Sequence, residues 1–234
     1  MNAGYHIVIP ARLASQRLPG KPLVMIAGRP LIEHVWRRAC EANAGSVVIA
    51  TDSEQIFQAA ASFGAEAVMT DAGHESGSDR IAECVDLKGW DDQTLIVNLQ
   101  GDEPLMPPAC LEQVAGLLHQ DRSADVASLY WPINTVVEVE DPNVVKAVVD
   151  QQGAALYFSR SVIPFPRGAS GVGQALAAGV SWKRHIGLYA SRAGALRAFA
   201  GMQATPLESL AQRDQRRFLE SGRGVVMARA SECV

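Results

Sequence analysis

Long hydrophobic runs are absent from this sequence of 234 residues. No apolar stretch approaches the roughly 18–20 residues that cross a bilayer as a helix, which argues against a membrane protein. The N-terminus also lacks a basic segment followed by an apolar stretch, so no signal peptide is indicated. We therefore expect a cytoplasmic protein that makes no use of a membrane.

An excess of positive charge is absent as well. The 21 Lys and Arg residues are outnumbered by 25 Asp and Glu residues, which gives a net charge of -4. A general nucleic-acid binder normally carries a basic excess, so we expect no nucleic-acid partner. With 48% hydrophobic and 20% charged residues, the chain has the composition of a globular protein with an ordinary core.

Cysteine is scarce and scattered. The four cysteines are Cys40, Cys84, Cys110 and Cys233, and no two of them form a CxxC pair or lie at metal spacing from a histidine. This pattern argues against a zinc site or a redox pair, and it predicts reduced, mostly buried thiols.

Strand and helix patterns alternate through the first half of the chain. Short apolar runs, typical of buried strands, alternate with segments whose apolar residues recur at helical spacing. The expected strands are 7–9, 46–50, 67–69 and 94–98, and the expected helices are 30–40, about 53–63 and 78–85. The alternation predicts an α/β fold, with a mostly parallel sheet and helices on both faces.

The second half is less regular. Its expected strands are 125–130, 144–149, 155–158, 186–189 and 224–228, and its expected helices are 192–200 and 206–221. The segment 167–179 is rich in Gly, Ala and Ser, which is typical of a flexible connection such as a lid or part of a dimer contact. We expect one domain with a small β-containing elaboration at about residues 130–190.

The stretch ARLASQRLPGKPL, residues 11–23, places three cations directly after the first apolar strand. Ligands of open parallel sheets bind beyond the carboxyl ends of the strands, where this loop lies. Gly20 permits a left-handed turn between two prolines, so the turn fixes the positions of Arg12 and Lys21. Both cations suit phosphate oxygens, although a solvated surface loop is the structural alternative.

A second polar segment, NLQGDEP at residues 98–104, follows the strongest apolar run. It brings Asp102 to the same edge of the sheet as the basic loop. An acid repels a triphosphate unless a divalent cation lies between them, and Mg²⁺ is commonly held by one or two carboxylates plus phosphate oxygens. A helix cap or a pair with an arginine is the structural alternative for Asp102. Together the two segments indicate nucleotide chemistry.

The sequence resembles the family of 3-deoxy-manno-octulosonate (Kdo) cytidylyltransferases, also called CMP-Kdo synthetases. The matching segments, in family order over nearly the whole length, are IPARLASQRLPGKPL, VVIATD, HESGSDRIAE, VNLQGDEPLMPP, DPNVVKAV, ALYFSR and KRHIGLYASRAG. The resemblance implies a Rossmann-like nucleotidyltransferase fold, a homodimer, and Mg²⁺-dependent transfer from CTP to Kdo for lipopolysaccharide biosynthesis. It also implies a CTP-binding part at about 1–130 and a sugar-binding and dimerisation elaboration at about 131–190.

The resemblance implies roles for individual residues at the nucleotide. The matches to the triphosphate loop are Arg12, Gly20 and Lys21, of which Lys21 is nearest the transferred phosphoryl group. The matches near the cytosine and ribose are Gly77, Ser78 and Arg80, and Ser78 stands where the family more often has Thr. Asp102 matches the metal position.

Further matches belong to the sugar. They are Gln100, Arg160, His185, Tyr189, Asp214 and Gln215. An arginine and a histidine suit the carboxylate of Kdo. For His185, a packed residue beside a strand is the structural alternative.

The sequence departs from the family towards its C-terminus. Asp214 is one methylene shorter than the family's sugar-facing Glu, and Arg213 and Arg216 stand where leucines are usual. That helix face is therefore either open or bound to something acidic, because buried unpaired arginines are costly. Relatives continue into a segment like PGVDTPEDL, whose Asp is the second metal ligand; the sequence given ends at Val234 without it, so we expect one metal carboxylate to be missing.

Two alternatives remain open from the sequence. One is another acceptor, such as 8-amino-Kdo or a different 2-keto-3-deoxy acid. The other is a catalytically weak nucleotide- or sugar-binding paralogue, which the missing tail and the altered helix favour.

Overall fold

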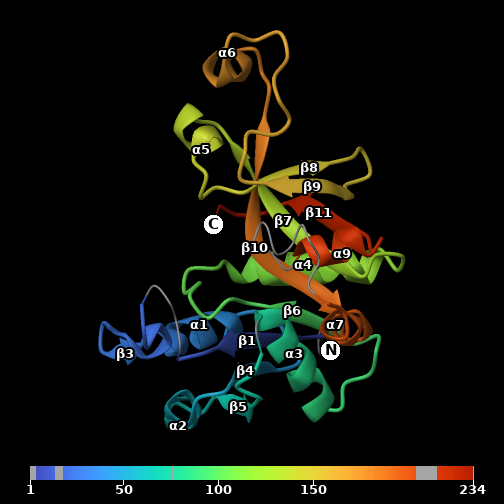
Figure 1. Ribbon diagram of the computed structural model, residues 1–234. Helices are drawn as coiled ribbons and strands as arrows, with labels where there is room; N and C mark the ends of the chain where they lie inside the picture. Colours follow the sequence, from blue (N-terminus) through green and yellow to red (C-terminus); the bar gives the residue numbers. More distant parts are fainter. Residues whose placement is uncertain (1–3, 14–17, 75, 204–214, 234) are drawn as a thin grey trace.

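The computed structural model describes residues 4–13, 18–74, 76–203 and 215–233, and within it nine strands form one mixed sheet (Figure 1). The main path runs β11-β7-β10-β6-β1-β4-β5, and β8 pairs with both β10 and β9. The strands are β1 (Tyr5–Ala11), β4 (Val47–Thr51), β5 (Glu66–Met69), β6 (Leu95–Asn98), β7 (Val126–Ile133), β8 (Lys146–Val149), β9 (Ala155–Ser159), β10 (Trp182–Arg192) and β11 (Val225–Arg229). A separate two-stranded ribbon consists of β2 (Met25–Ile26) and β3 (Arg29–Pro30). The predicted α/β fold class is confirmed.

Helices cover both faces of the parallel part of the sheet. They are α1 (Leu31–Cys40), α2 (Glu54–Ser62), α3 (Gly77–Leu87), α4 (Pro108–Gln120), α5 (Val136–Glu140), α6 (Val172–Ala177), α7 (Ala193–Ala200) and α9 (Gln215–Glu220), with a 3-10 turn η1 (Lys21–Leu23). Because neighbouring strand residues point to opposite faces, Ile7 and Ile9 pack in the core under α1 and α4, while Val8 packs under α3 and α7. This two-sided burial explains why the strands read as continuous apolar runs.

The central strand β1 pairs in parallel with β4 on one side and β6 on the other. Their carboxyl ends, at Ala11, Thr51 and Asn98, therefore lie at one edge of the sheet. The segments that leave this edge include the basic loop after β1 and the QGDEP turn after β6.

The antiparallel part differs most from the expectation. The sequence predicted a strand at 186–189, but β10 runs for 11 residues from Trp182 to Arg192, between β7 and β6. Lys183 and Arg184 interrupt the apolar pattern in the first half of β10, although their strand neighbours Trp182 and His185 are buried. Helices α4 and α5 were not predicted either.

A projection that carries α5, α6, β8 and β9 rises from the end of β7 and the start of β10 (Figure 1). The expectation of a flexible connection at 167–179 is wrong for its centre, which forms α6. Val172 and Ala175, three residues apart, pack with Val139 of α5 and Trp182 of β10. Packing on this small core outweighs the weak helix propensity of Gly173 within α6.

The cysteine prediction is half right. Cys84 and Cys110 are buried, but Cys40 and Cys233 are exposed, and all four are free thiols. Cys40 is exposed because it lies in the last, solvent-facing position of α1. In the part of the chain that the structure describes, no helix has the length and apolar character needed to cross a membrane.

Candidate active site

The basic loop is shaped by its glycine. Gly20 has φ 70°, in the left-handed region, and its N–H donates to the carbonyl of Leu13 at 3.0 Å, which closes the loop. The next residues form η1, in which Pro22 is buried. The side chain of Lys21 therefore starts from a fixed backbone.

Lys21 and Asp102 meet, as their positions at one sheet edge predicted. The Nζ of Lys21 lies 2.5 Å from Oδ2 of Asp102, and their side chains are 37% and 47% exposed. An ion pair this exposed contributes only about 0–1 kcal/mol, so a bound phosphate or cation can replace either partner at low cost. The contact is a salt bridge with a lysine rather than the arginine pair that was the structural alternative.

The turn that carries Asp102 packs tightly on the end of β1. A Cβ at Gly101 would lie 3.0 Å from the carbonyl oxygen of Pro10, so this position needs a glycine. Burial and the neighbouring Asp102 charge raise the pKa of Glu103, while the cations Lys21 and Arg184 act in the opposite direction. The turn thus places the carboxylates of Asp102 and Glu103 close to Lys21.

A cavity of about 130 Å³ opens next to this turn. Its lining residues are Pro10, Ala11, Arg12, His74, Ser76, Gly77, Arg80 and Gln100. Four of the residues predicted from the sequence, Arg12, Gly77, Arg80 and Gln100, therefore meet in one place. Ser78 is buried in the first turn of α3 and is not part of the lining.

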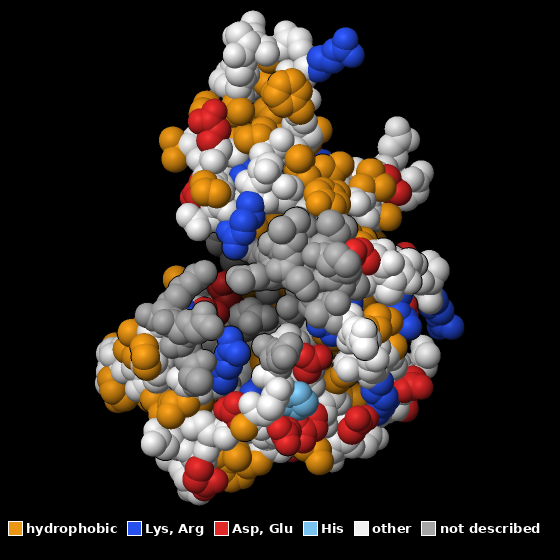
Figure 2. Space-filling view, in the orientation of Figure 1, with side chains coloured by type: hydrophobic (Ala, Val, Ile, Leu, Met, Phe, Trp, Pro, Cys, Tyr) orange, Lys and Arg blue, Asp and Glu red, His pale blue; other side chains and the backbone are white. Residues whose placement is uncertain are grey.

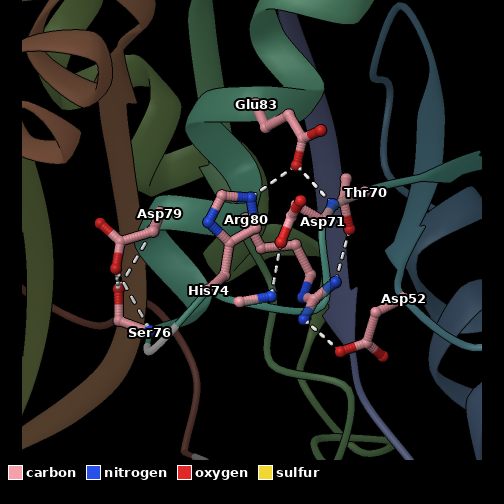
Figure 3. A network of polar contacts seen from close by, with 9 residues as sticks. Asp52, Thr70, Asp71, His74, Ser76, Asp79, Arg80 and Glu83 are labelled. Atoms are coloured by element: carbon pink, nitrogen blue, oxygen red, sulfur yellow. Dashed lines mark hydrogen bonds and ion pairs between the residues drawn. The ribbon is translucent and has the colours of Figure 1, made fainter.

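Arg80 enters the cavity from α3 as a buried cation, only 3% exposed. Its guanidinium donates to Asp52 at 2.7 Å and to Thr70 at 2.5 Å (Figure 3). These partners follow β4 and β5 directly, so Arg80 ties the ends of two strands to the helix. A buried charge satisfied in this way holds its place without a ligand.

His74 is a lining residue that the sequence reasoning missed. Its Nε2 lies 2.5 Å from Oε2 of Glu83, which also accepts the backbone N–H of Asp71 at 2.8 Å (Figure 3). When Nε2–H donates to the carboxylate, Nδ1 of the neutral ring is left as an acceptor. No pattern in the sequence marks His74, which stands just before the Ser-Gly turn and meets Glu83 of α3 only in the folded chain.

Helix α3 begins at the cavity with a capping box. Ser76 Oγ accepts from the N–H of Asp79 at 3.1 Å, and Oδ2 of Asp79 accepts from the N–H of Ser76 at 3.2 Å. The cap fixes the backbone at Gly77, where the positive end of the helix dipole faces the cavity.

Of the residues matched to the sugar, Gln100 lies apart in the cavity lining after β6, whereas His185 and Tyr189 lie in the antiparallel part. His185 is 7% exposed, and its ring lies 5.0 Å from that of Phe158 and 5.3 Å from that of Tyr189. Its Nε2 is 3.0 Å from the hydroxyl of Ser128, which also lies 2.9 Å from the carbonyl oxygen of Leu188, at an irregularity in the pairing of β10 with β7.

Arg160 is exposed just beyond β9, and its guanidinium donates to the carbonyl of Pro142 at 2.7 Å. Asp214 and Arg213 lie outside the described residues, and Gln215 is described only as the first backbone position of α9.

No group of three or more His, Cys, Asp or Glu side chains is placed for metal binding within the described residues. A divalent cation at Asp102 would also take oxygen ligands from a bound molecule and from water. Carboxylate oxygens, combined with phosphate oxygens, are the hard donors that Mg²⁺ prefers.

Comparison with known proteins finds relatives over nearly the whole chain. The cytidylyltransferase family pattern matches residues 6–226. The chain is 50% identical over 230 residues to a 3-deoxy-manno-octulosonate cytidylyltransferase from Thioalkalivibrio sulfidiphilus, covering 97% of this chain and 91% of the relative. It is 45% identical over 225 residues to the protein of the same name from Halorhodospira halophila, covering 96% and 88%.

Among solved structures, a CMP:2-keto-3-deoxy-manno-octonic acid synthetase complexed with CTP superposes with a TM-score of 0.87 at 37% identity, over 97% of this chain and 90% of that one. The expected nucleotidyltransferase fold is thereby confirmed. By sequence and by structure, the chain belongs to the cytidylyltransferase family.

Proposed function

We propose that this protein transfers the cytidylyl group of CTP to Kdo, giving CMP-Kdo and pyrophosphate for lipopolysaccharide biosynthesis. The observation that carries the proposal is the cavity where Arg12, Gly77, Arg80 and Gln100 meet, next to the Lys21–Asp102 pair. The names of the close relatives and of the CTP-bound structure support the same substrates.

In this reaction the anomeric hydroxyl oxygen of Kdo bonds to the α-phosphorus of CTP. The bond from that phosphorus to the pyrophosphate oxygen breaks, and the hydroxyl proton is released. Charge spreads over the phosphate oxygens, so fixed cations aimed at them lower the barrier. Arg12 and Lys21 would supply these charges, with Lys21 exchanging Asp102 for a phosphate oxygen.

Mg²⁺ is the proposed cofactor, held by Asp102 together with phosphate oxygens. The half-exposed carboxylate of Asp102, paired with a single lysine, is free enough to take this role. When bound, Mg²⁺ neutralises phosphate charge and lowers the pKa of a coordinated hydroxyl.

The Kdo end would be formed by the antiparallel part of the sheet. Arg160 would pair with the sugar carboxylate, and His185 and Tyr189 would contact the sugar with Gln100. Asp214 and Gln215 are proposed to complete this end.

We also propose that the protein is a homodimer. Hydrophobic side chains gather on the projection (Figure 2), and Val137, Leu156 and Phe165 are 79%, 59% and 81% exposed. Exposed apolar area of this kind marks an association surface. Light scattering on the purified protein tests this, and a monomer at micromolar concentration would contradict it.

The activity is tested by pyrophosphate release from CTP and Kdo, with and without Mg²⁺. The expected result is release that needs both substrates and the metal. Parallel reactions with UTP and with 8-amino-Kdo measure the choice of base and of acceptor. Tight CTP binding without release from either acceptor would contradict the proposal and would indicate a binding paralogue.

A further inference from the structure

Lys146 is the most deeply buried cation of the described chain. It lies in β8 between the apolar residues Val145 and Ala147, and it is 0% exposed. Burying an ammonium group is expensive unless every donor finds an acceptor. An apolar side chain would fill this place at lower cost, so the lysine calls for an explanation.

The ammonium group of Lys146 holds three backbone carbonyls. Its Nζ donates to Asp141 at 2.8 Å, to Val144 at 2.9 Å and to Arg160 at 3.0 Å. An ammonium has three N–H donors, so these contacts use all of them. Two of the acceptors belong to the turn just before β8, whereas the third is the main chain of Arg160, 14 residues later.

The same turn also holds the side chain of Arg160. The guanidinium donates to the carbonyl of Pro142 at 2.7 Å, between two of the residues that Lys146 contacts. Arg160 is thus fixed at its main chain by Lys146 and at its side chain by the turn that Lys146 closes. Burial and the nearby Arg160 charge lower the pKa of Lys146, whereas Asp141 raises it.

The backbone of β8 links this unit to the second residue assigned to the sugar. Lys146 pairs with Ser159 of β9 and with Arg184 of β10. The N–H of His185 donates to the carbonyl of Val145 at 2.8 Å. Lys146 is therefore flanked in the sheet by Ser159, which precedes Arg160, and by Arg184, which precedes His185.

We infer that Lys146 is a positioning residue that presets Arg160 for the carboxylate of the sugar acid. The inference rests on the proposed function, because it takes Arg160 as the residue that binds this carboxylate. Lys146 has no exposed surface with which to touch the substrate, so it acts only through the segment that it ties down. An arginine that is already held in place loses less conformational freedom on binding than a free surface arginine does. A misplacement of 1 Å at such a site lowers the rate by up to about 100-fold.

The test is a double-mutant cycle in the full-length protein, with Lys146→Met and Arg160→Ala. Lys146→Met should raise the KM for Kdo at least ~10-fold, with the Kd for CTP unchanged. In the Arg160→Ala background, Lys146→Met should add less than ~2-fold, because the two residues act on one contact. Ala147→Gly, which weakens the same strand without removing a donor, should leave the KM for Kdo unchanged.

Three outcomes separate the possible failures. If Arg160→Ala leaves the KM for Kdo unchanged, the sugar-binding role of Arg160 and the inference both fall. If Arg160→Ala raises it but Lys146→Met does not, only the positioning role falls. If the two effects multiply in the double variant, Lys146 acts as a general structural residue and the inference is wrong. Should Lys146→Met not fold, Lys146→Gln, which is neutral and has two donors, carries the same expectation and the same outcomes.

Discussion

Two lysines show how differently the two ends of this protein are built. Lys21 lies at the end of the sheet that we propose binds CTP, called the nucleotide end; it is 37% exposed and pairs with one half-exposed carboxylate. Lys146 lies beside the residues that we propose bind Kdo, called the sugar end; it is fully buried and bonds to three backbone carbonyls. The first arrangement exchanges partners easily with a ligand or a metal, and the second fixes the backbone before any ligand arrives.

The strands explain the difference. At the nucleotide end, β1, β4 and β6 run parallel, and their loops bring polar groups to one edge that faces solvent. At the sugar end, β7, β8 and β10 pair antiparallel, and the polar groups lie within the sheet. We therefore expect substitutions at the nucleotide end to act on turnover and CTP binding, and those at the sugar end to act on Kdo binding.

The largest effect is expected for Lys21→Ala. Losing a charge aimed at the transferred phosphoryl group should lower kcat by about 1000-fold and weaken CTP binding, while the fold survives. Pyrophosphate release measures the first effect and calorimetry the second.

Lys88→Ala is the matched control, since Lys88 also forms a partly exposed pair, with Glu66, far from the cavity. It should leave both values unchanged. Full activity and normal CTP affinity in Lys21→Ala would remove the basic loop from the site.

Asp102→Asn should have the next largest effect. The substitution keeps the shape of the side chain but removes the charge proposed to hold Mg²⁺, so turnover at moderate Mg²⁺ should fall about 100-fold. Titration with Mg²⁺ should show a raised half-saturating concentration. A near-normal rate with an ordinary Mg²⁺ dependence would mean that Asp102 only pairs with Lys21.

The sequence predicted which groups of the nucleotide end lie close together, because they belong to loops that leave the ends of parallel strands. Gly20 and Lys21 lie in the loop after one apolar run and Asp102 in the turn after another, and the rule that parallel strands share a carboxyl edge brings them together. His74 was missed because a single histidine before a turn has no periodicity that marks it, and only its contact with Glu83 gives it a fixed place.

The sugar end was harder to predict, because long-range pairing decides it. The match of Arg160 and His185 came from resemblance alone, and nothing local to either residue indicated Lys146 between them. The cations at 183 and 184 broke the apolar pattern of β10, and α6 depends on contacts with Trp182 rather than on its own composition. Strand register and tertiary packing are not readable from one sequence.

Two histidines, one at each end, test the same difference between the ends, and we expect smaller effects from their substitution. His74→Ala removes an acceptor from the cavity and should weaken CTP binding about 10-fold, with the KM for Kdo unchanged. His185→Asn keeps a polar group near Ser128 and should raise the KM for Kdo about 10-fold, with CTP binding unchanged.

Thermal unfolding of both variants gives the control. His185 is buried among aromatic rings, so a loss of stability with an unchanged KM for Kdo would favour the packing role over the sugar role. For His74, Glu83→Gln should reproduce part of the loss, because the carboxylate orients the ring.

The smallest effect is expected for Glu103→Gln, which tests the electrostatics of the QGDEP turn without removing a group proposed to bind substrate. Burial and the charge of Asp102 raise the pKa of Glu103 above its ordinary value of 4.5. The folded state therefore holds the proton of Glu103 more tightly than the unfolded state, and ionisation destabilises the fold as the pH rises from below 4.5 through the raised pKa. Gln cannot ionise, so the variant should be slightly more stable than the parent at pH 7 and should lose this advantage below about pH 4. Urea unfolding at pH 4 and pH 7 measures the difference. An advantage equal at both pH values would mean that the Glu103 carboxylate contributes through packing, and a variant less stable at pH 7 would mean that Lys21 and Arg184 outweigh the burial of Glu103.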